Sequence, residues 1–140
     1  MVTSIATYIA FRGQTREAFE HYRDLFGGEL EIITYGDMPM PGMDMPPDAV
    51  AHAVLTTDAG VLAGSDAVDD DEYPIRGSAY SFLLTFATVE EAQRVGAAML
   101  EAGGEVQMPF ELAPWGDHYG QMFDRFGVMW ALNVPGEPTP

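Results

Sequence analysis

The residues that could carry out acid–base or metal chemistry in this chain are few, and His52 stands out among them. There are three histidines and no cysteine. His52 lies in an apolar stretch, 49–57, that is typical of a β-strand. A histidine there can pack inside the sheet with one backbone partner. It can also point at a ligand as an acid or base, because an unperturbed imidazole titrates near pH 6.5.

His118 is a weaker candidate for acid–base chemistry than His52. His118 follows Asp117 directly, and neighbours on a strand point to opposite faces. This spacing does not make a catalytic dyad, so we expect His118 at an exposed rim.

Several familiar chemistries are excluded. Without cysteine there are no disulfides and no thiolate metal sites. Ser65 stands in Ala-Gly-Ser-Asp rather than in a nucleophile elbow, and no Walker loop or HExxH motif occurs. The acidic run 66–77 lacks the spacing of an EF-hand loop. A serine hydrolase and a calcium site are therefore poor hypotheses.

The charge of the chain narrows its partners. Its formal net charge is −16, and all six basic residues are arginines. Such a chain repels phosphate backbones, which argues against binding to nucleic acid or to an anionic membrane. No window is long and apolar enough to span a bilayer. We expect a soluble cytoplasmic protein.

The elements that position these residues form a module used twice. Residues 8–30 predict a strand, a polar turn with Thr15 as N-cap, an amphipathic helix and a second strand after Gly27-Gly28. Residues 82–106 repeat the pattern, with Thr88 as N-cap and Gly103-Gly104 as the stop.

Two further strands are predicted after each repeat. The fold class is therefore α+β, with two βαβββ modules forming cupped mixed sheets around a cleft. We expect one domain over residues 1–140, with a first module at about 1–66, an acidic linker at about 67–77 and a second module at about 78–134. The Met- and Pro-rich segment 38–47 is either a packed loop or an adaptable lid.

Side chains at strand ends and in the second half are candidates to line such a cleft. Tyr35 follows the second strand and Ser65 lies near the end of the fourth. In the second module we expect either packing or a flat wall for a planar ligand from three aromatic residues, Trp115, Tyr119 and Trp130.

The chain resembles the vicinal oxygen chelate superfamily (glyoxalase, bleomycin-resistance and dioxygenase fold), and more narrowly its PhnB-like branch. The matching segments are Tyr8-Ile9-Ala10-Phe11, Glu17-Ala18 with His21-Tyr22, Phe26-Gly27-Gly28-Glu29, Tyr35-Gly36-Asp37-Met38-Pro39, His52-Ala53, Ala63-Gly64-Ser65-Asp66, Trp115-Gly116 with Tyr119-Gly120, and Asp124-Arg125-Phe126-Gly127-Val128-Met129-Trp130. This resemblance implies paired modules, a homodimer and a ligand cleft, but no single reaction. The branch is traditionally labelled a demethylubiquinone methyltransferase. The sequence does not support this label, because it has no Gly-rich nucleotide-binding loop of the kind a methyltransferase would use.

Metal-dependent members of that superfamily hold a divalent ion with His, Gln or Glu side chains, two from each module. Counting from Tyr22 and the turn glycines places these positions at Thr7, Val54, Ser81 and Ala131, none of which is a usual ligand. A shift in register recovers only His52. We therefore expect no cofactor, although a divalent metal stays as an alternative.

Three functions follow as hypotheses. The first is a metal-free protein that binds a small, partly apolar molecule in a dimeric cleft through His52, Tyr35, Ser65, Trp115, Tyr119 and Trp130. The second is a lyase, isomerase or dioxygenase whose metal site has moved to His52 with Glu111 or Asp117. The third is a non-catalytic interaction protein.

Overall fold

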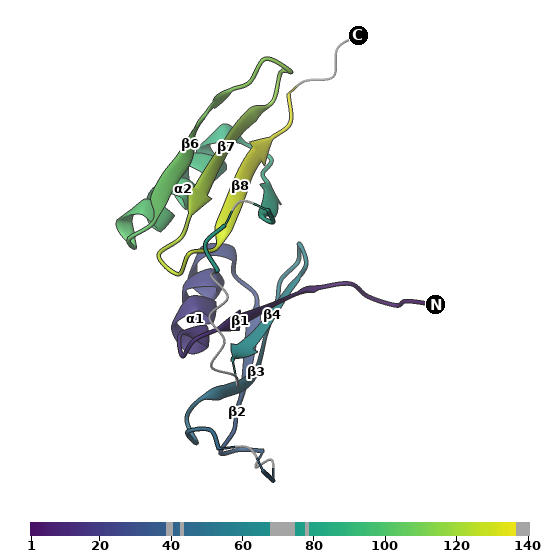
Figure 1. Cartoon of the computed structure of the whole chain (residues 1–140). Coiled ribbons are helices and arrows are strands. Elements are labelled where there is room, and N and C mark those ends of the chain that lie inside the picture. The colour runs from purple at the N-terminus through teal and green to yellow at the C-terminus, as the bar shows by residue number, and fades with distance from the viewer. Residues whose placement is uncertain (39–40, 43, 68–74, 78, 137–140) are drawn as a thin grey trace. The chain divides into compact units, whose positions relative to one another are not determined.

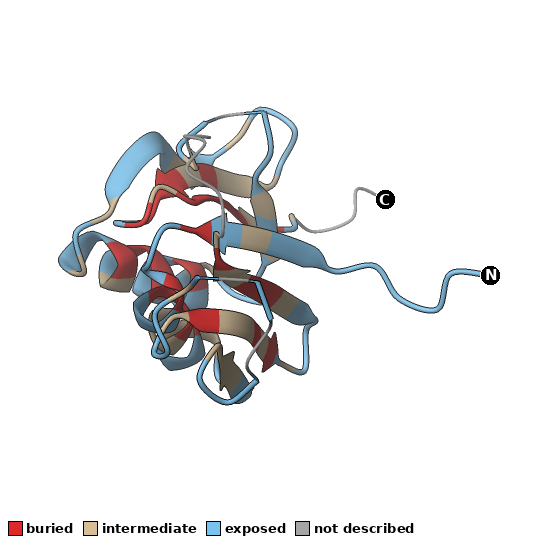
Figure 2. Cartoon of the chain, turned by 60° about the horizontal axis from the view of Figure 1, so that its bottom comes forward, coloured by how far each residue is buried: buried red, intermediate tan, exposed pale blue. Residues whose placement is uncertain are grey.

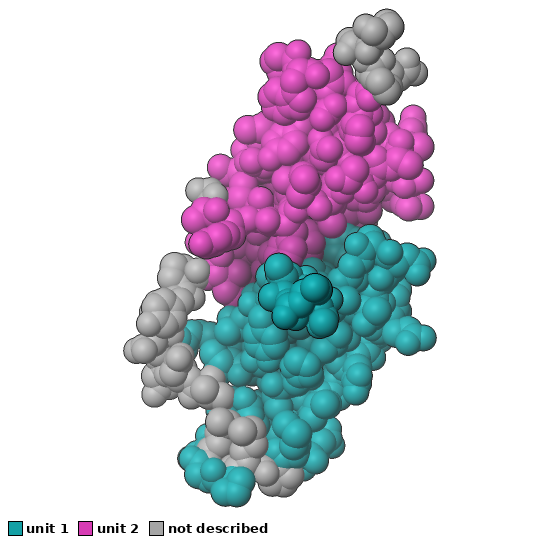
Figure 3. Space-filling model, turned by 90° about the vertical axis from the view of Figure 1, so that its right-hand side faces the viewer, with its two compact units in different colours: residues 1–72 teal, residues 73–140 magenta. Residues whose placement is uncertain are grey.

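The computed structural model describes residues 1–38, 41–42, 44–67, 75–77 and 79–136. It divides into two compact units, 1–72 and 73–140, each of which is described by itself (Figure 3). In unit 1 the elements are β1 (Thr7–Phe11), α1 (Thr15–Phe26), β2 (Glu29–Thr34), β3 (Val50–Thr56) and β4 (Val61–Asp66). In unit 2 they are β5 (Phe82–Thr85), α2 (Val89–Glu101), β6 (Glu105–Leu112), β7 (His118–Phe123) and β8 (Met129–Val134).

Each unit is a four-stranded sheet with one helix against one of its faces (Figure 1). The strand orders are β1-β4-β3-β2 and β5-β8-β7-β6, and only the first pair of each order is parallel. The predicted βαβββ repeat and the α+β class are therefore confirmed. Most of the buried side chains lie between helix and sheet (Figure 2).

The start of α1 differs from the prediction. Thr15 is the first helical residue rather than the N-cap, which is Gln14 and makes no side-chain cap. The Thr15 hydroxyl instead donates to Asp66 Oδ1 at 2.7 Å. The N-cap at Thr88 is confirmed, because its hydroxyl accepts from the Glu91 N–H at 3.2 Å.

The second glycine of each Gly-Gly pair is required by a close approach of backbone. A Cβ at Gly28 would lie 2.3 Å from the carbonyl oxygen of Thr56, the last residue of β3. A Cβ at Gly104 would lie 2.7 Å from that of Phe123, the last residue of β7. The repeat in the sequence therefore reflects one packing constraint met twice.

The two helix–sheet contacts are filled in opposite ways. In unit 1 the large side chain comes from the helix, since a Cβ at Gly64 of β4 would lie 3.0 Å from the Phe19 ring. In unit 2 it comes from the sheet, since Leu132 of β8 lies 3.3 Å from the Cβ position of Gly96 on α2. A small residue faces a large one in both units, which is how closely packed layers interdigitate.

Several predicted boundaries shift. The β-branched and aromatic residues from Ser4 to Phe11 predict a strand, which in the structure begins only at Thr7, and the strand predicted over residues 78–87 spans only Phe82–Thr85. Asp66, the first residue of the acidic run 66–77, belongs to β4 and is 6% exposed. Parts of the Met- and Pro-rich segment (39–40 and 43) and of the acidic linker (68–74) lie outside the described residues.

Candidate functional site

The face of each sheet opposite its helix, called the open face below, carries the candidate site residues. In unit 1 the strand pairing places Phe11, Ala53 and Leu55 on the helix side, where they are fully buried. Because side chains alternate along a strand, the open face of unit 1 carries Tyr8, Ala10, Glu31, Ile33, His52, Val54, Ala63 and Ser65.

Tyr8 and His52 form the central pair of this face. The Tyr8 Oη lies 3.3 Å from His52 Nδ1, and the rings stack with centroids 5.8 Å apart at 20°. The two residues belong to β1 and β3, with β4 between them. Ala63 pairs with Tyr8 across β1 and β4 and is 8% exposed, so the rings meet over a small side chain.

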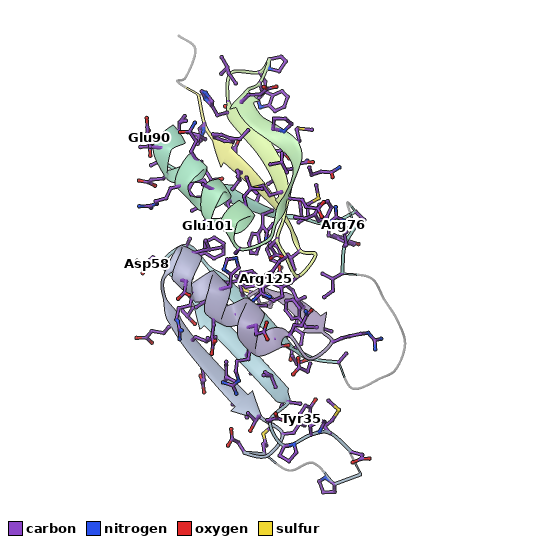
Figure 4. All side chains as sticks on the ribbon, turned by 90° about the vertical axis from the view of Figure 1, so that its left-hand side faces the viewer. Tyr35, Asp58, Arg76, Glu90, Glu101 and Arg125 are labelled. Atoms are coloured by element: carbon purple, nitrogen blue, oxygen red, sulfur yellow. The ribbon has the colours of Figure 1, made fainter. Side chains whose placement is uncertain are left out.

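Tyr35 and Ser65 lie on the same side of unit 1. Tyr35 directly follows β2 and is half-buried (Figure 4). The pKa of its phenol is raised above 10.0, first by desolvation and then by the nearby Tyr8 and Asp66. Ser65 pairs with Ala10, and continuing the β3–β4 register by one residue places it beside His52. His52 and Ser65 thus share the open face of unit 1, and Tyr35 lies near Tyr8 of that face.

Asp66 links the elements of unit 1 from the helix side of the sheet. Its carboxylate accepts from the Thr15 hydroxyl and N–H through Oδ1, and from the Val50 N–H at 2.9 Å through Oδ2. It therefore ties the start of α1 to β3 and β4. A carboxylate with three donors is structurally committed rather than available to a ligand.

The open face of unit 2 holds an aromatic corner, defined here as Trp115 and Tyr119. Their ring centroids are 5.9 Å apart at 61°. Gln121 Nε2 donates to the Tyr119 hydroxyl at 3.0 Å. Glu111 of β6 pairs directly with Tyr119 of β7 and therefore shares its face. The predicted Trp115 and Tyr119 are thus brought together.

Trp130 lies apart from this corner. It is 1% exposed, its ring stacks on Phe82 with centroids 4.6 Å apart, and its indole N–H donates to Asp124 Oδ2 at 2.9 Å. This position favours the packing alternative for Trp130 over a role in a ligand wall.

His118 and Asp117 do not act as a dyad. Asp117 Oδ1 accepts from the Gly136 N–H at 2.8 Å. His118 is half-buried, not fully exposed as expected, and its ring lies 5.8 Å from that of Phe110.

Two residues of these faces were missed by the sequence analysis. Tyr8 was assigned only to the strand, although its alternation with the buried Phe11 places it on the open face. Gln121 lies two residues after Tyr119 on β7 and therefore shares its face.

The side chains at the positions expected to hold a metal do not suit one. Thr7 pairs with Leu62 on the helix side, so the count for β1 was wrong by one residue. The predicted Val54 lies on the open face of β3, and Ser81 precedes β5. The registers of the two repeats make another set equivalent on the open faces, namely Tyr8, Ala63, Leu83 and Ala131. Only Tyr8 offers an oxygen atom, and none is His, Glu or Gln. Within the described ranges, no group of three His, Asp or Glu residues is placed to hold a metal ion.

Two βαβββ units, each with a Gly-Gly stop after its helix, are features of a known family. The model of the glyoxalase/bleomycin resistance protein/dioxygenase superfamily covers residues 4–132. The chain belongs to this superfamily. The resemblance to its PhnB-like branch is confirmed by a solved relative described below.

Three relatives illustrate the match. Protein YjdN of Escherichia coli is 31% identical, over 93% of this chain and 94% of its own length. Protein PA1353 of Pseudomonas aeruginosa has a TM-score of 0.83 and 34% identity, over 97% of this chain and 100% of that one. The putative 3-demethylubiquinone-9 3-methyltransferase PhnB of Bacillus cereus has a TM-score of 0.77 and 27% identity, over 95% and 100%.

No described helix has the length and apolar character needed to cross a membrane. The open faces carry the polar and aromatic side chains described above. Their side chains can donate and accept protons through Tyr8, Tyr35 and His52, and can stack on a planar group through Trp115 and Tyr119.

Proposed function

We propose that this protein binds a small, partly apolar molecule on the open faces of its sheets without the divalent metal of other superfamily members. The observation that carries the proposal is the set of repeat-equivalent positions Tyr8, Ala63, Leu83 and Ala131. Side chains that could hold an ion are replaced there by one phenol and three apolar groups. Such a surface suits an organic ligand better than a metal.

The polar groups around these positions fit the same ligand class. His52 and Tyr8 offer a hydrogen-bonding pair 3.3 Å apart on unit 1, and Trp115 with Tyr119 offers ring faces on unit 2. We further propose that the protein works in the cytoplasm as a homodimer. Whether the ligand is only bound or also converted depends on His52 and Tyr8, which can exchange a proton.

A metal-dependent lyase, isomerase or dioxygenase is the alternative, and it requires a relocated site. His52 belongs to unit 1, whereas Glu111 and Asp117 belong to unit 2, and Asp117 already accepts a backbone hydrogen bond. We do not extend the methyltransferase name of the Bacillus cereus protein to this chain. The strand β1 is followed by Arg12-Gly13-Gln14, which is not a Gly-rich nucleotide-binding loop.

Elemental analysis tests the metal-free part of the proposal. Protein purified without chelators should carry far less than one zinc, nickel, iron or manganese atom per subunit. Its melting temperature should not change when these ions are added. One tightly held metal per subunit would reject the proposal in favour of the relocated site, and its loss in His52→Ala would identify the ligand.

Ligand binding is tested with a panel of soluble phenols and planar heterocycles. We expect some members to raise the melting temperature of the wild type and to lose this effect in His52→Ala or Trp115→Ala. His21→Ala is the matched control, because His21 lies on α1 against the other face of the sheet. A panel without any effect would favour the non-catalytic interaction protein instead.

A further inference from the structure

We propose that the ligand carries an alkylated or quaternary ammonium group, held in the aromatic corner of Trp115 and Tyr119 with Glu111 as its counter-ion. This inference rests on the proposed function, since it names the chemical class of the small molecule bound there. It uses only residues of unit 2.

The rings provide the first part of the site. Trp115 and Tyr119 meet edge to face, with their planes at 61° and their centroids 5.9 Å apart, so the rings are not stacked on each other. Trp115 is 64% exposed, while Tyr119 is half-buried. A cation is attracted to the negative face of an aromatic ring, most strongly to that of tryptophan. The exposed face of Trp115 can therefore contact an ammonium group with the Tyr119 ring beside it.

Glu111 provides the charge. It lies directly opposite Tyr119 in the β6–β7 pairing, and Cβ atoms of such pairs are about 5 Å apart. The side chain of Glu111 is exposed. In the described part of unit 2, the observed ion pair joins Arg76 to Glu105 and does not involve Glu111. A carboxylate beside two ring faces favours a cation over a neutral ligand.

The corner is held in shape by its surroundings. Gln121 positions the Tyr119 hydroxyl at 3.0 Å. The loop that carries Trp115 is closed by the Ala113 N–H to the Asp117 carbonyl at 2.8 Å and by the Gly116 N–H to the Ala113 carbonyl at 3.0 Å. A site whose rings are already fixed loses less entropy when it binds.

The arginine side chains of unit 2, which could compete with a cationic ligand, contact groups other than the aromatic corner. Arg76 is 2.9 Å from Glu105 and lies over the Phe123 ring, and Arg125 lies over the Phe126 ring. Arg94 belongs to α2, on the other face of the sheet. With a net charge of −16 on the whole chain, the surrounding potential also concentrates cations and repels anions.

Two matched ligands test the inference. The cation 3-hydroxyphenyltrimethylammonium and the neutral 3-tert-butylphenol have nearly the same shape and differ in charge. We expect the cation to bind about tenfold more tightly by calorimetry, because a cation–π contact at an exposed ring and the charge of Glu111 both favour it. In ¹H–¹⁵N spectra the indole signal of the exposed Trp115 should shift on binding and that of the buried Trp130 should not.

The variant Glu111→Gln should weaken binding of the cation about fivefold and leave the neutral ligand unchanged. Glu101→Gln is the control, because this exposed residue at the end of α2 changes the net charge equally at another place (Figure 4). Trp115→Ala should abolish binding of the cation.

Three outcomes would overturn the inference. If both ligands bind equally, the corner selects planar molecules and not charge, and the proposed small-molecule function stands. If Glu101→Gln acts like Glu111→Gln, only the net charge matters. If neither ligand binds, the ammonium site does not exist, while the panel of phenols and heterocycles decides the proposed function separately.

Discussion

The Tyr8 hydroxyl lies 3.3 Å from His52 Nδ1 although the two residues are 44 positions apart and stand on strands that are not neighbours. β4, which separates β1 from β3, carries two small side chains between the rings: Ala63 pairs with Tyr8, and the continued register places Ser65 beside His52. A longer side chain there would stand between the rings. The contact between Tyr8 and His52 therefore depends on β4 as well as on the two strands that carry these residues.

We predict that Ala63→Leu separates Tyr8 from His52 without unfolding the protein. The added atoms extend from the open face, where no helix covers them, so the cost in stability should be small. The contact between the Tyr8 and His52 rings, followed by nuclear Overhauser effects, should disappear. Ala10→Leu, on the same face of β1, should keep it. Persistence of the ring contact in Ala63→Leu would show that the crossing point does not control the pair.

Local signals predicted the elements of this fold well, and contacts between distant residues explain what they missed. The Thr88 cap depends on residues within one turn, and each Gly-Gly pair lies directly after or close to the end of its helix. The role of Thr15 could not be predicted, because its partner Asp66 lies 51 positions away.

The candidate site was predicted in part for the same reason. His52, Tyr35 and Ser65 were assigned to strands or strand ends whose open face follows from alternation. Tyr8 was missed, and Thr7 was placed on the wrong face, because the phase of a five-residue strand depends on its register with β4. For Trp130, composition could not distinguish an aromatic wall from a core residue bonded to Asp124.

The paired glycines give a second prediction. Gly28→Ala should lower the free energy of unfolding by about 2–4 kcal/mol, because its Cβ would lie 2.3 Å from the Thr56 carbonyl oxygen and its φ is 98°. Gly13→Ala has a similar φ of 84° but open space around the Cβ position. It should cost only the backbone strain of about 1 kcal/mol.

Urea unfolding of Gly13→Ala, Gly28→Ala and Gly104→Ala separates these two effects. Gly104→Ala should resemble Gly28→Ala, since its Cβ would lie 2.7 Å from the Phe123 carbonyl oxygen. Because Gly104 has no positive φ, a loss of stability in Gly104→Ala reports the close approach alone. If Gly28→Ala cost no more than Gly13→Ala and Gly104→Ala were nearly neutral, φ alone would set the cost and the close approach of backbone would be unimportant.

Asp124 leads to a third prediction. It is 3% exposed, and its carboxylate accepts from the N–H groups of Phe126 and Val128 and from the indole of Trp130. Asp124→Ala leaves these donors without their acceptor and should cost about 3–5 kcal/mol. In a Trp115→Phe background, the fluorescence of Trp130 should also shift to the red as its surroundings open.

The corresponding turn of unit 1 provides the control. There the Thr57 hydroxyl accepts from the N–H groups of Ala59 and Gly60, while Asp58 is exposed (Figure 4). Asp58→Ala should therefore be nearly neutral and Thr57→Ala should destabilise. If Asp58→Ala were as damaging as Asp124→Ala, the carboxylate in each turn would have a role that these hydrogen bonds do not explain.

The turn after β2 gives a fourth prediction, on acid stability. The pKa of Asp37 is lowered from 3.8, mainly because its carboxylate accepts from the Thr34 N–H at 3.1 Å and also because the Thr34 hydroxyl is close. A carboxyl whose pKa is lower in the folded state contributes stability above its unfolded pKa. This contribution is lost as the pH falls through the folded value. Asp37→Asn should therefore narrow the difference in stability between pH 6 and pH 2, whereas Asp44→Asn, an exposed change in the following segment, should not.

The last prediction concerns Tyr35, whose pKa is raised above 10.0 by desolvation first, and then by Tyr8 and Asp66. A group with a raised folded pKa stabilises the protein below the unfolded value, and this contribution is lost as the pH rises through the folded value. The difference in absorbance near 295 nm between wild type and Tyr35→Phe isolates this phenol, and its midpoint should lie above pH 10. In Tyr8→Phe the midpoint should fall, because no second phenolate then opposes the charge. A midpoint that Tyr8→Phe leaves unchanged would mean that Tyr35 and Tyr8 are too far apart to act on one ligand.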